Sequence, residues 1–368
     1  MYSFTIDCHV ILTVIIVLSL LYSSQLFVVW TNQCIFDNKM TLIPYLIPLF
    51  LSLGFFLLFV ISSKLSDAIF AFVCKILGLY FGYVIYIFQI SLIIRILIIF
   101  ANIPQLVNAL LLYLIPLFIC IYGIINALIT KIEKITLKFP GYKDKTTILH
   151  LSDIHLGAIH QKKSIIRIVK EVEELNPDIV VITGDLADGS LRVKADWLKP
   201  FNKLEVPILY VTGNHEELNP EEEMLEEVKK TKIKHIGLCQ KYKFKDINFF
   251  GLDYGYNIRK KLSKANLREG EVNILLSHVP EMKPEELSEY NVFLFLAGHT
   301  HGGQIFPLNI LAYFSNVCFS GLYTDSSNSH YVYVSQGVNN AVIPMRVCSS
   351  RIFALITIEG KEDNEDNI

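Results

Sequence analysis

The chain has 368 residues, of which 52% are hydrophobic and 18% charged, and its formal net charge is −2. This length is large for one domain, and the charge shows no basic excess of the kind that a nucleic-acid-binding protein carries. The seven cysteines form no CxxC pair and no regular spacing, which argues against a disulfide framework and a cysteine zinc site.

The amino-terminal part of the chain has the composition of a membrane protein. Only seven Asp, Glu, Lys or Arg residues precede Lys131. About 20 consecutive apolar residues are needed to cross a bilayer as a helix. Four stretches meet this need and predict four transmembrane spans: Val10–Trp30, Thr41–Ser63, Ile76–Ile94 and Val107–Thr130. The last two are separated by a polar turn at Asn102–Gln105. We therefore expect residues 1–131 to form a multi-span anchor, followed by a juxtamembrane linker over residues 132–145.

The positions of Lys and Arg in the short loops predict the orientation of these spans. Lys64, Lys75 and the juxtamembrane lysines from Lys131 onward fall on one side, and only Lys39 and Arg95 fall on the other. This pattern places both termini and the carboxyl-terminal half in the cytoplasm. No cluster of acidic or histidine residues lies within the spans, which favours an anchor over a transporter.

From Thr146 to Gly360 the pattern changes to short β-branched runs that alternate with polar helical segments, which is typical of a layered α/β domain. The expected strands lie around residues 148–151, 179–183, 208–212, 249–252, 272–276, 292–296, 331–334 and 352–358, and two helices are expected over Ser164–Leu175 and Glu221–Lys230. The acidic tail, residues 361–368, has no apolar periodicity and is expected to be disordered.

Polar residues that can bind metals follow five of these runs. They form an ordered series: Asp153-x-His155, Gly184-Asp185-Leu186-Ala187-Asp188, Gly213-Asn214-His215-Glu216, Ser277-His278, and Gly298-His299-Thr300-His301-Gly302-Gly303-Gln304. Sites in α/β sheets gather beyond the carboxyl ends of the strands, so these residues are expected to converge. His299 and His301 would point to opposite faces of a strand, so a turn is needed there.

This series resembles the calcineurin-like metallophosphoesterase superfamily, whose pattern is D-x-H, G-D-x-x-D, G-N-H-[DE], a lone H and then G-H-x-H. The resemblance implies an α/β/β/α sandwich. The G-H-T-H-G-G-Q ending, with Val334–Gly337 and Ile343–Arg346, is similar to the branch of bacterial YkuE proteins and transmembrane proteins with a metallophosphoesterase domain.

The resemblance also implies roles for individual residues. One metal is expected to be held by Asp153, His155 and His301, a second by Asn214, His278 and His299, and Asp185 is expected to bridge them. The implied reaction is attack on phosphorus by a metal-bridging hydroxide, with Mn, Fe or Zn as the divalent ions. His215 is expected to contact the phosphate and to protonate the leaving oxygen. Asp188 would orient a histidine or its loop, or else cap a helix. Arg346 would meet a second anionic group or form a surface salt bridge.

The predicted function is a membrane-anchored hydrolase of phosphomonoesters or phosphodiesters, and the anchor suggests a lipid-linked substrate as a hypothesis. A non-catalytic membrane receptor or scaffold with the same fold is the alternative. A nuclease is disfavoured because no basic and aromatic groove is evident. The sequence leaves the oligomeric state open.

Overall fold

The computed structural model describes residues 8–36, 43–61, 66–218 and 221–360, and these divide into two compact units, residues 1–124 and 125–368. The acidic tail expected to be disordered lies outside the described residues. We describe each unit by itself.

The first unit consists of long apolar helices. They are α1 (Cys8–Phe36), α2 (Ile43–Ile61), α3 (Asp67–Phe100) and α4 (Gln105–Leu128), whose last turn belongs to the second unit. Among the residues that the structure describes, α3 and α4 are long and apolar enough to cross a membrane. The break predicted at Asn102–Gln105 lies between these two helices.

Helix α3 extends well beyond the predicted span Ile76–Ile94. It has 34 residues, because nothing between Asp67 and Phe100 breaks a helix, and single charges such as Lys75 do not end one. Within the unit the Arg95 guanidinium lies 3.8 Å from the centre of the Trp30 ring, which gives this charge a cation–π partner.

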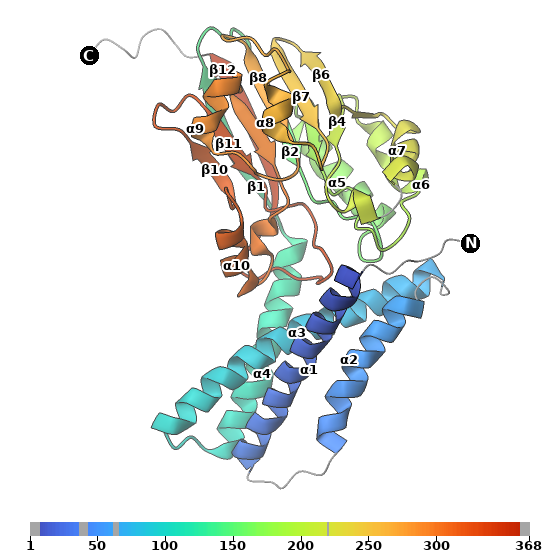
Figure 1. Ribbon diagram of the computed structural model, residues 1–368, viewed down its shortest axis with the longest axis vertical. Coiled ribbons are helices and arrows are strands. Elements are labelled where there is room, and N and C mark those ends of the chain that lie inside the picture. Colours follow the sequence, from blue (N-terminus) through green and yellow to red (C-terminus); the bar gives the residue numbers. More distant parts are fainter. Residues whose placement is uncertain (1–7, 37–42, 62–65, 219–220, 361–368) are drawn as a thin grey trace. The chain divides into compact units, whose positions relative to one another are not determined.

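The second unit contains two six-stranded sheets (Figure 1). The first sheet has the order β1-β12-β2-β3-β4-β5 and the second the order β10-β11-β9-β8-β7-β6. In the first, the strands are β1 (Thr130–Phe139), β12 (Arg351–Gly360), β2 (Thr146–Leu151), β3 (Ile179–Thr183), β4 (Ile208–Val211) and β5 (Ile233–His235). In the second they are β10 (Gly321–Thr324), β11 (Tyr331–Val334), β9 (Leu294–Ala297), β8 (Val272–Leu276), β7 (Ile247–Leu252) and β6 (Leu238–Phe244).

Apolar side chains on both faces of the central strands create the layers. In β3, Ile179 and Val181 belong to the core between the two sheets, whereas Val180 and Ile182 face helices α5 (Lys162–Leu175) and α7 (Glu221–Lys229). The outer face of the second sheet packs against α8 (Ile258–Leu262) and α9 (Pro284–Leu287). The four layers confirm the predicted α/β/β/α fold.

The segment predicted to be a linker, residues 132–145, instead contains most of β1. This strand pairs in parallel with β12 along its whole length, from Thr130 opposite Arg351 to Phe139 opposite Gly360. Glu133 on β1 also accepts a hydrogen bond of 2.7 Å from the Tyr333 hydroxyl of the second sheet. The first strand of the domain is therefore β1, which is separated from the end of α4 by the single residue Ile129.

Candidate metal centre

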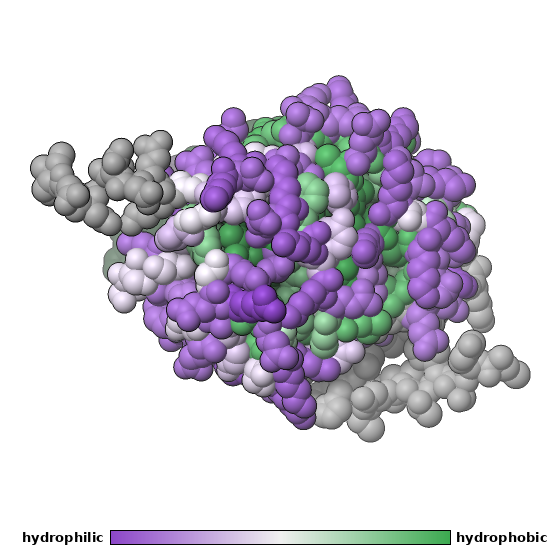
Figure 2. Space-filling view, turned by 90° about the horizontal axis from the view of Figure 1, so that it is seen from above, coloured by the Kyte–Doolittle hydropathy of each residue, from purple (hydrophilic) through white to green (hydrophobic). Residues whose placement is uncertain are grey.

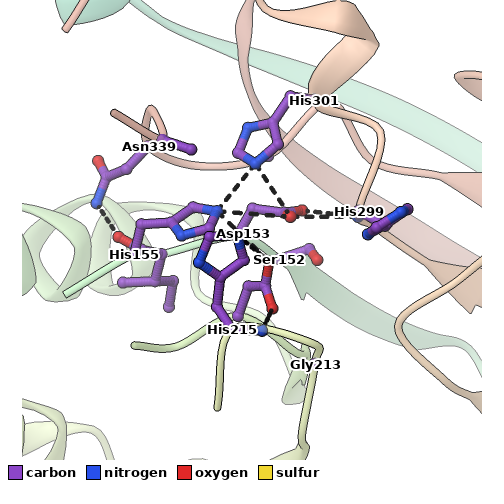
Figure 3. Close-up of polar contacts among 12 residues, drawn as sticks. Ser152, Asp153, His155, Gly213, His215, His299, His301 and Asn339 are labelled. Atoms are coloured by element: carbon purple, nitrogen blue, oxygen red, sulfur yellow. Dashed lines mark hydrogen bonds and ion pairs between the residues drawn. The ribbon is translucent and has the colours of Figure 1, made fainter. Parts of the chain in front are cut away.

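The polar series lies at one edge of the paired sheets. Strands β2, β3 and β4 are parallel neighbours in the first sheet, and β8 and β9 are parallel neighbours in the second. The loops that leave their carboxyl ends carry all the residues for which metal binding was predicted: Asp153, His155, Asp185, Asn214, His278, His299 and His301. The structure brings these seven residues and His215 together, as the close-up in Figure 3 shows for several of them.

One group of side chains consists of Asp153, His155 and His301. The Nε2 atoms of the two imidazoles are 2.9 Å apart, and His301 Nε2 lies 3.4 Å from Asp153 Oδ1. Ligand atoms at about 2.0–2.2 Å from one metal ion are separated from each other by distances of this order. The three atoms are thus spaced as ligands of one cation.

The second group is built around Asn214. Its Oδ1 lies 3.1 Å from His278 Nε2 and 2.9 Å from His299 Nδ1. His278 Nδ1 lies 2.8 Å from the Thr183 carbonyl and must donate its hydrogen to it, so Nε2 of the neutral ring presents a lone pair to Asn214. A lone pair facing an amide oxygen is unfavourable unless a proton or a cation lies between them.

Asp185 joins the two groups. Its Oδ2 lies 3.2 Å from His278 Nε2 and 3.6 Å from His155 Nε2, while its Oδ1 accepts a hydrogen bond of 2.9 Å from the His215 amide. The side chain is almost completely buried. One carboxylate oxygen therefore faces both groups, which is the arrangement that a bridging ligand requires.

The protonation states of the histidines fit metal binding. Burial lowers the pKa of His155 to about 3, that of His299 to about 4 and that of His301 well below its usual value, so their rings are neutral and keep a free lone pair. Burial also lowers the pKa of His278, but the adjacent Asp185 carboxylate outweighs it and raises the pKa to about 10. The site thus stabilises a positive charge between His278 and Asp185, and a bound metal ion would supply that charge.

The donor set indicates the class of ion that it would hold. Imidazole nitrogens, carboxylate oxygens and one amide oxygen suit Mn, Fe or Zn better than Ca, which takes oxygen ligands. One further observation supports a cation. The Nε2 atoms of His155 and His278, one from each group, both face Oδ2 of Asp185.

His215 lies at the edge of the group and is half-buried. Its Nδ1 is 3.0 Å from the backbone carbonyl of Asp188, to which it donates, and its Nε2 lies 4.0 Å from Asp185 Oδ2. The hydrogen bond fixes the ring, so that Nε2 faces the space beside the carboxylate. This atom is positioned to meet a ligand bound at the metal centre.

Asp188 acts on His215 through its backbone and not through its carboxylate. The carboxylate Oδ1 accepts hydrogen bonds from the amide and hydroxyl of Ser190 within its own loop. No described helix begins at Asp188, since α6 (Ala195–Leu198) starts later, so the helix-cap prediction is wrong. The carbonyl of Asp188 orients the histidine.

Two positions in these loops require glycine. A Cβ at Gly213 would lie 2.2 Å from Asp185 Oδ1, and one at Gly184, where φ is +85°, would lie 2.5 Å from His278 Nδ1. Five of the acidic and histidine residues also have left-handed backbones: Asp153, His155, Asp185, His299 and His301. Such conformations are found at functional sites, where the surrounding structure maintains them. The turn predicted between His299 and His301 is present.

Glu216 belongs to the Gly-Asn-His-Glu motif, but its role was not predicted. Its side chain is fully buried and accepts hydrogen bonds from the backbone amides of Asp185, Ala187 and Gly213, at 3.0, 2.8 and 2.6 Å. One carboxylate thus connects the loop after β3 to the loop after β4. The only signal in the sequence was an acidic residue directly after the motif histidine.

Arg346 is fully buried, so the prediction of a surface salt bridge is wrong, and its hydrogen bonds go to backbone carbonyls and not to a second anionic group. The side chain donates to the carbonyls of His301, Gly337 and Asn339. Burial lowers its pKa to about 10, so it remains charged at neutral pH. Arg346 thus holds the backbone of His301 in place.

The two-sheet fold and this cluster of histidine and acidic residues define a metallophosphoesterase domain. The sequence profile described as calcineurin-like phosphoesterase matches residues 146–303. An uncharacterized metallophosphoesterase of Campylobacter jejuni is 30% identical over 269 residues, which cover 70% of this chain and 71% of that protein. The chain belongs to the calcineurin-like metallophosphoesterase family.

The chain is also similar to part of a longer sequence relative and to a solved structure. A protein of Danio rerio named transmembrane protein with metallophosphoesterase domain is 32% identical over 256 residues, or 63% of this chain. The match covers 58% of that relative's length. A crystal structure of a dimetal phosphatase from Danio rerio has a TM-score of 0.34 and 15% identity, over 54% of this chain and 88% of the other.

Proposed function

We propose that this protein is a membrane-anchored phosphoesterase that hydrolyses phosphomonoesters or phosphodiesters with two divalent metal ions. The observation that carries the proposal is the position of Asp185, whose Oδ2 faces both His155 and His278 at 3.6 and 3.2 Å. A carboxylate placed in this way can hold two cations close together while it offsets their repulsion.

The two groups of side chains would each hold one ion, of Mn, Fe or Zn. The first ion would be bound by Asp153, His155 and His301, the second by Asn214, His278 and His299, and both by Asp185. When bound, the ions would lower the pKa of water to near neutrality and polarise the phosphoryl group.

The protein's own residues would position the substrate and move a proton. His215 Nδ1 donates to the carbonyl of Asp188, so the proton that this ring gains or loses is on Nε2, which faces the centre. From Nε2, His215 would donate a hydrogen bond to a phosphate oxygen and would protonate the leaving oxygen. Asp185 Oδ1 accepts a hydrogen bond from the backbone amide of His215 and thereby keeps this histidine beside the centre.

Membrane anchorage is supported by helices α3 and α4 and by a relative named as a transmembrane protein. We extend this to a multi-pass anchor with a cytoplasmic catalytic unit, on the basis of Lys64, Lys75 and Lys131, which flank the predicted spans on one side. An enzyme held at a bilayer meets lipids at high local concentration, so we propose a lipid-linked phosphoester as its substrate.

The full-length protein in detergent provides the test. Hydrolysis of bis(p-nitrophenyl) phosphate is measured with Mn, Fe or Zn, for the wild type and for Asp185→Asn. We expect metal-dependent activity that Asp185→Asn abolishes and that Asp246→Asn, a matched substitution in the exposed turn between β6 and β7, retains. Absence of activity with all three metals would indicate the non-catalytic receptor or scaffold instead.

A further inference from the structure

A short apolar helix, α10 (Leu308–Ser315), follows the metal centre and leaves its side chains exposed. None of its residues is buried, and Phe314, Leu311 and Tyr313 are 80%, 64% and 59% exposed. The exposed large apolar side chains of this segment are Phe306, Leu308, Ile310, Leu311, Tyr313, Phe314 and Val317.

No charged residue accompanies these side chains. The sequence from Gly302 to Thr324 contains no Asp, Glu, Lys or Arg. Exposed apolar residues scattered singly are ordinary, but a contiguous apolar patch on a soluble unit marks an interaction surface. By contrast, Figure 2 shows a face of the molecule on which hydrophilic side chains predominate.

The base of α10 is fixed to the loop over residues 341–349. Val347 donates its amide to the Gln304 carbonyl at 2.9 Å, and Phe306 donates its amide to the Val347 carbonyl at 3.2 Å. The side chain of Gln304 donates to the carbonyls of Ala341 and Ile343. This loop also carries the exposed Val342. Helix α10 is therefore held by its base and not by its apolar side chains.

The same loop binds the last turn of α4. Asn126 Nδ2 donates to the carbonyls of Arg346 and Ser349, at 3.0 and 2.8 Å. All these residues belong to the second unit. The end of α4 is itself apolar and exposed at Leu128 and Ile129. The loop therefore connects two exposed apolar segments, one of which continues an apolar helix long enough to cross a membrane.

We propose that α10 lies in the interface of the lipid bilayer that α4 enters, with Leu311, Tyr313 and Phe314 inserted among the lipids. The proposal rests on the membrane anchorage proposed above. Continuity with α4 favours lipid over a protein partner, because the hydrogen bonds of Asn126 tie the loop at the base of α10 to the last turn of α4. Aromatic and aliphatic side chains without acidic neighbours are typical of interfacial helices.

Helix α10 also packs against the turn that carries His301. In this turn, η5 (His301–Gly303), a Cβ at Gly303 would lie 2.1 Å from Asn309 Cα. The distance between the docked helix and His301 is therefore fixed. A centre held in this way would receive phosphate groups of membrane lipids from the plane of the bilayer.

Fluorescence quenching in vesicles of brominated phosphatidylcholine tests the docking without using activity. Tryptophan is introduced by Phe314→Trp in the full chain and, as the control, by Tyr254→Trp at an exposed aromatic position outside α10. The native Trp30 and Trp197 give the background, which is subtracted. We expect the tryptophan at 314 to be quenched and blue-shifted, because an interfacial helix buries its apolar face about 5–10 Å into the headgroup and acyl boundary.

The outcomes separate the two proposals. The docking is overturned if brominated lipid quenches the emission of Phe314→Trp no more than that of the control. A blue shift without quenching also overturns it and indicates that a protein partner covers α10. If the signal of the wild type, which contains Trp30 of α1, is also unquenched, the proposed anchorage fails too.

An activity measurement complements the quenching. Leu311→Glu combined with Phe314→Glu is expected to lower hydrolysis of phosphatidic acid in phosphatidylcholine vesicles severalfold, while hydrolysis of soluble bis(p-nitrophenyl) phosphate stays unchanged. Equal loss on both substrates would contradict a role specific to the lipid surface.

Discussion

The guanidinium of Arg346 donates from Nη1 to the backbone carbonyl of His301 at 3.2 Å, and from Nη2 to the carbonyl of Asn339 at 2.6 Å. Asn339 in turn donates its backbone amide to the Asp153 carbonyl at 3.0 Å. One buried cation thus positions two residues of the first metal group without binding a metal itself.

Replacement of Arg346 by methionine is expected to weaken metal binding. The substitution keeps an apolar stem but removes the donor to the Asn339 carbonyl and one of the two donors to the His301 carbonyl, which keeps only the Gln304 amide. Loss of a residue that orients a ligand costs roughly 10–100-fold in metal affinity. Calorimetric titration with Mn or Zn measures the change, and Arg259→Met at an exposed salt bridge is the matched control. Unchanged affinity in Arg346→Met would rule out the positioning role.

Replacement of Glu216 by glutamine tests the connection between the two loops. The amide offers one acceptor oxygen where the carboxylate has two, and its NH2 group would face a backbone donor in a fully buried place. An unsatisfied buried donor costs about 1–3 kcal/mol. We expect a lower melting temperature for Glu216→Gln than for Glu217→Gln, its exposed neighbour. Equal melting temperatures would refute this role.

Histidine 150 predicts a pH dependence of stability. Its ring is fully buried beside Thr183, and burial lowers the pKa from 6.5 to about 3. Below pH 6.5 the unfolded chain therefore takes up a proton at this position that the folded chain does not take up until about pH 3. Folded-state stability consequently falls as the pH drops through this window, by about 1 kcal/mol between neutral pH and pH 5.5 from this group alone.

The variant His150→Gln isolates that contribution. It cannot titrate, so the free energy of unfolding should fall less between pH 7.5 and pH 5.5 than in the wild type. Pulse proteolysis at the two pH values measures both proteins. The same dependence in both would show that His150 does not contribute.

Metal removal should destabilise the second unit. A bound ion stabilises only the folded state, because only the folded chain holds the ligand atoms around Asp185 together. We expect a chelator to lower the melting temperature of the wild type and to leave that of Asp185→Asn nearly unchanged, with Asp246→Asn behaving like the wild type. A wild-type melting temperature insensitive to both chelator and added metal would contradict binding at this site.

Strand β1 determines where a stable fragment can begin. A fragment that starts at Thr146 lacks β1 and exposes the edge of β12, which invites edge-to-edge association. We expect it to aggregate in conditions where a fragment starting at Ile125 remains dispersed in mild detergent, as measured by size-exclusion chromatography. Equal dispersion of the two fragments would argue against a structural role for β1.

The sequence predicted the parts of the structure that depend on local pattern. Strands such as Ile179–Thr183 are runs of apolar residues that are buried on both faces. Their side chains alternate between two cores, so an uninterrupted apolar run predicts such a strand. Convergence of the polar series follows from the parallel strand order, because the carboxyl ends of neighbouring strands meet at one edge. The family resemblance, based on five motifs in order, is confirmed by the comparisons.

What the sequence did not reveal depends on distant partners. In β1, Lys131, Glu133, Lys134 and Lys138 give the composition of a linker, and only pairing with β12 makes this segment a strand. Glu216 and Arg346 act on backbone groups, which carry no signature in the sequence. The extent of α3 was missed because its charged residues resembled the ends of a membrane span.

The pairing of β1 with β12 also bears on the order of folding during synthesis. Thr130 and Arg351 are 221 residues apart, yet their side chains hydrogen-bond across neighbouring strands. Closing so long a loop is slow, and the first strand leaves the ribosome long before its partner. The first sheet can be completed only after residues Arg351–Gly360 have been made, so β1 lacks its partner strand while the rest of the domain is being translated.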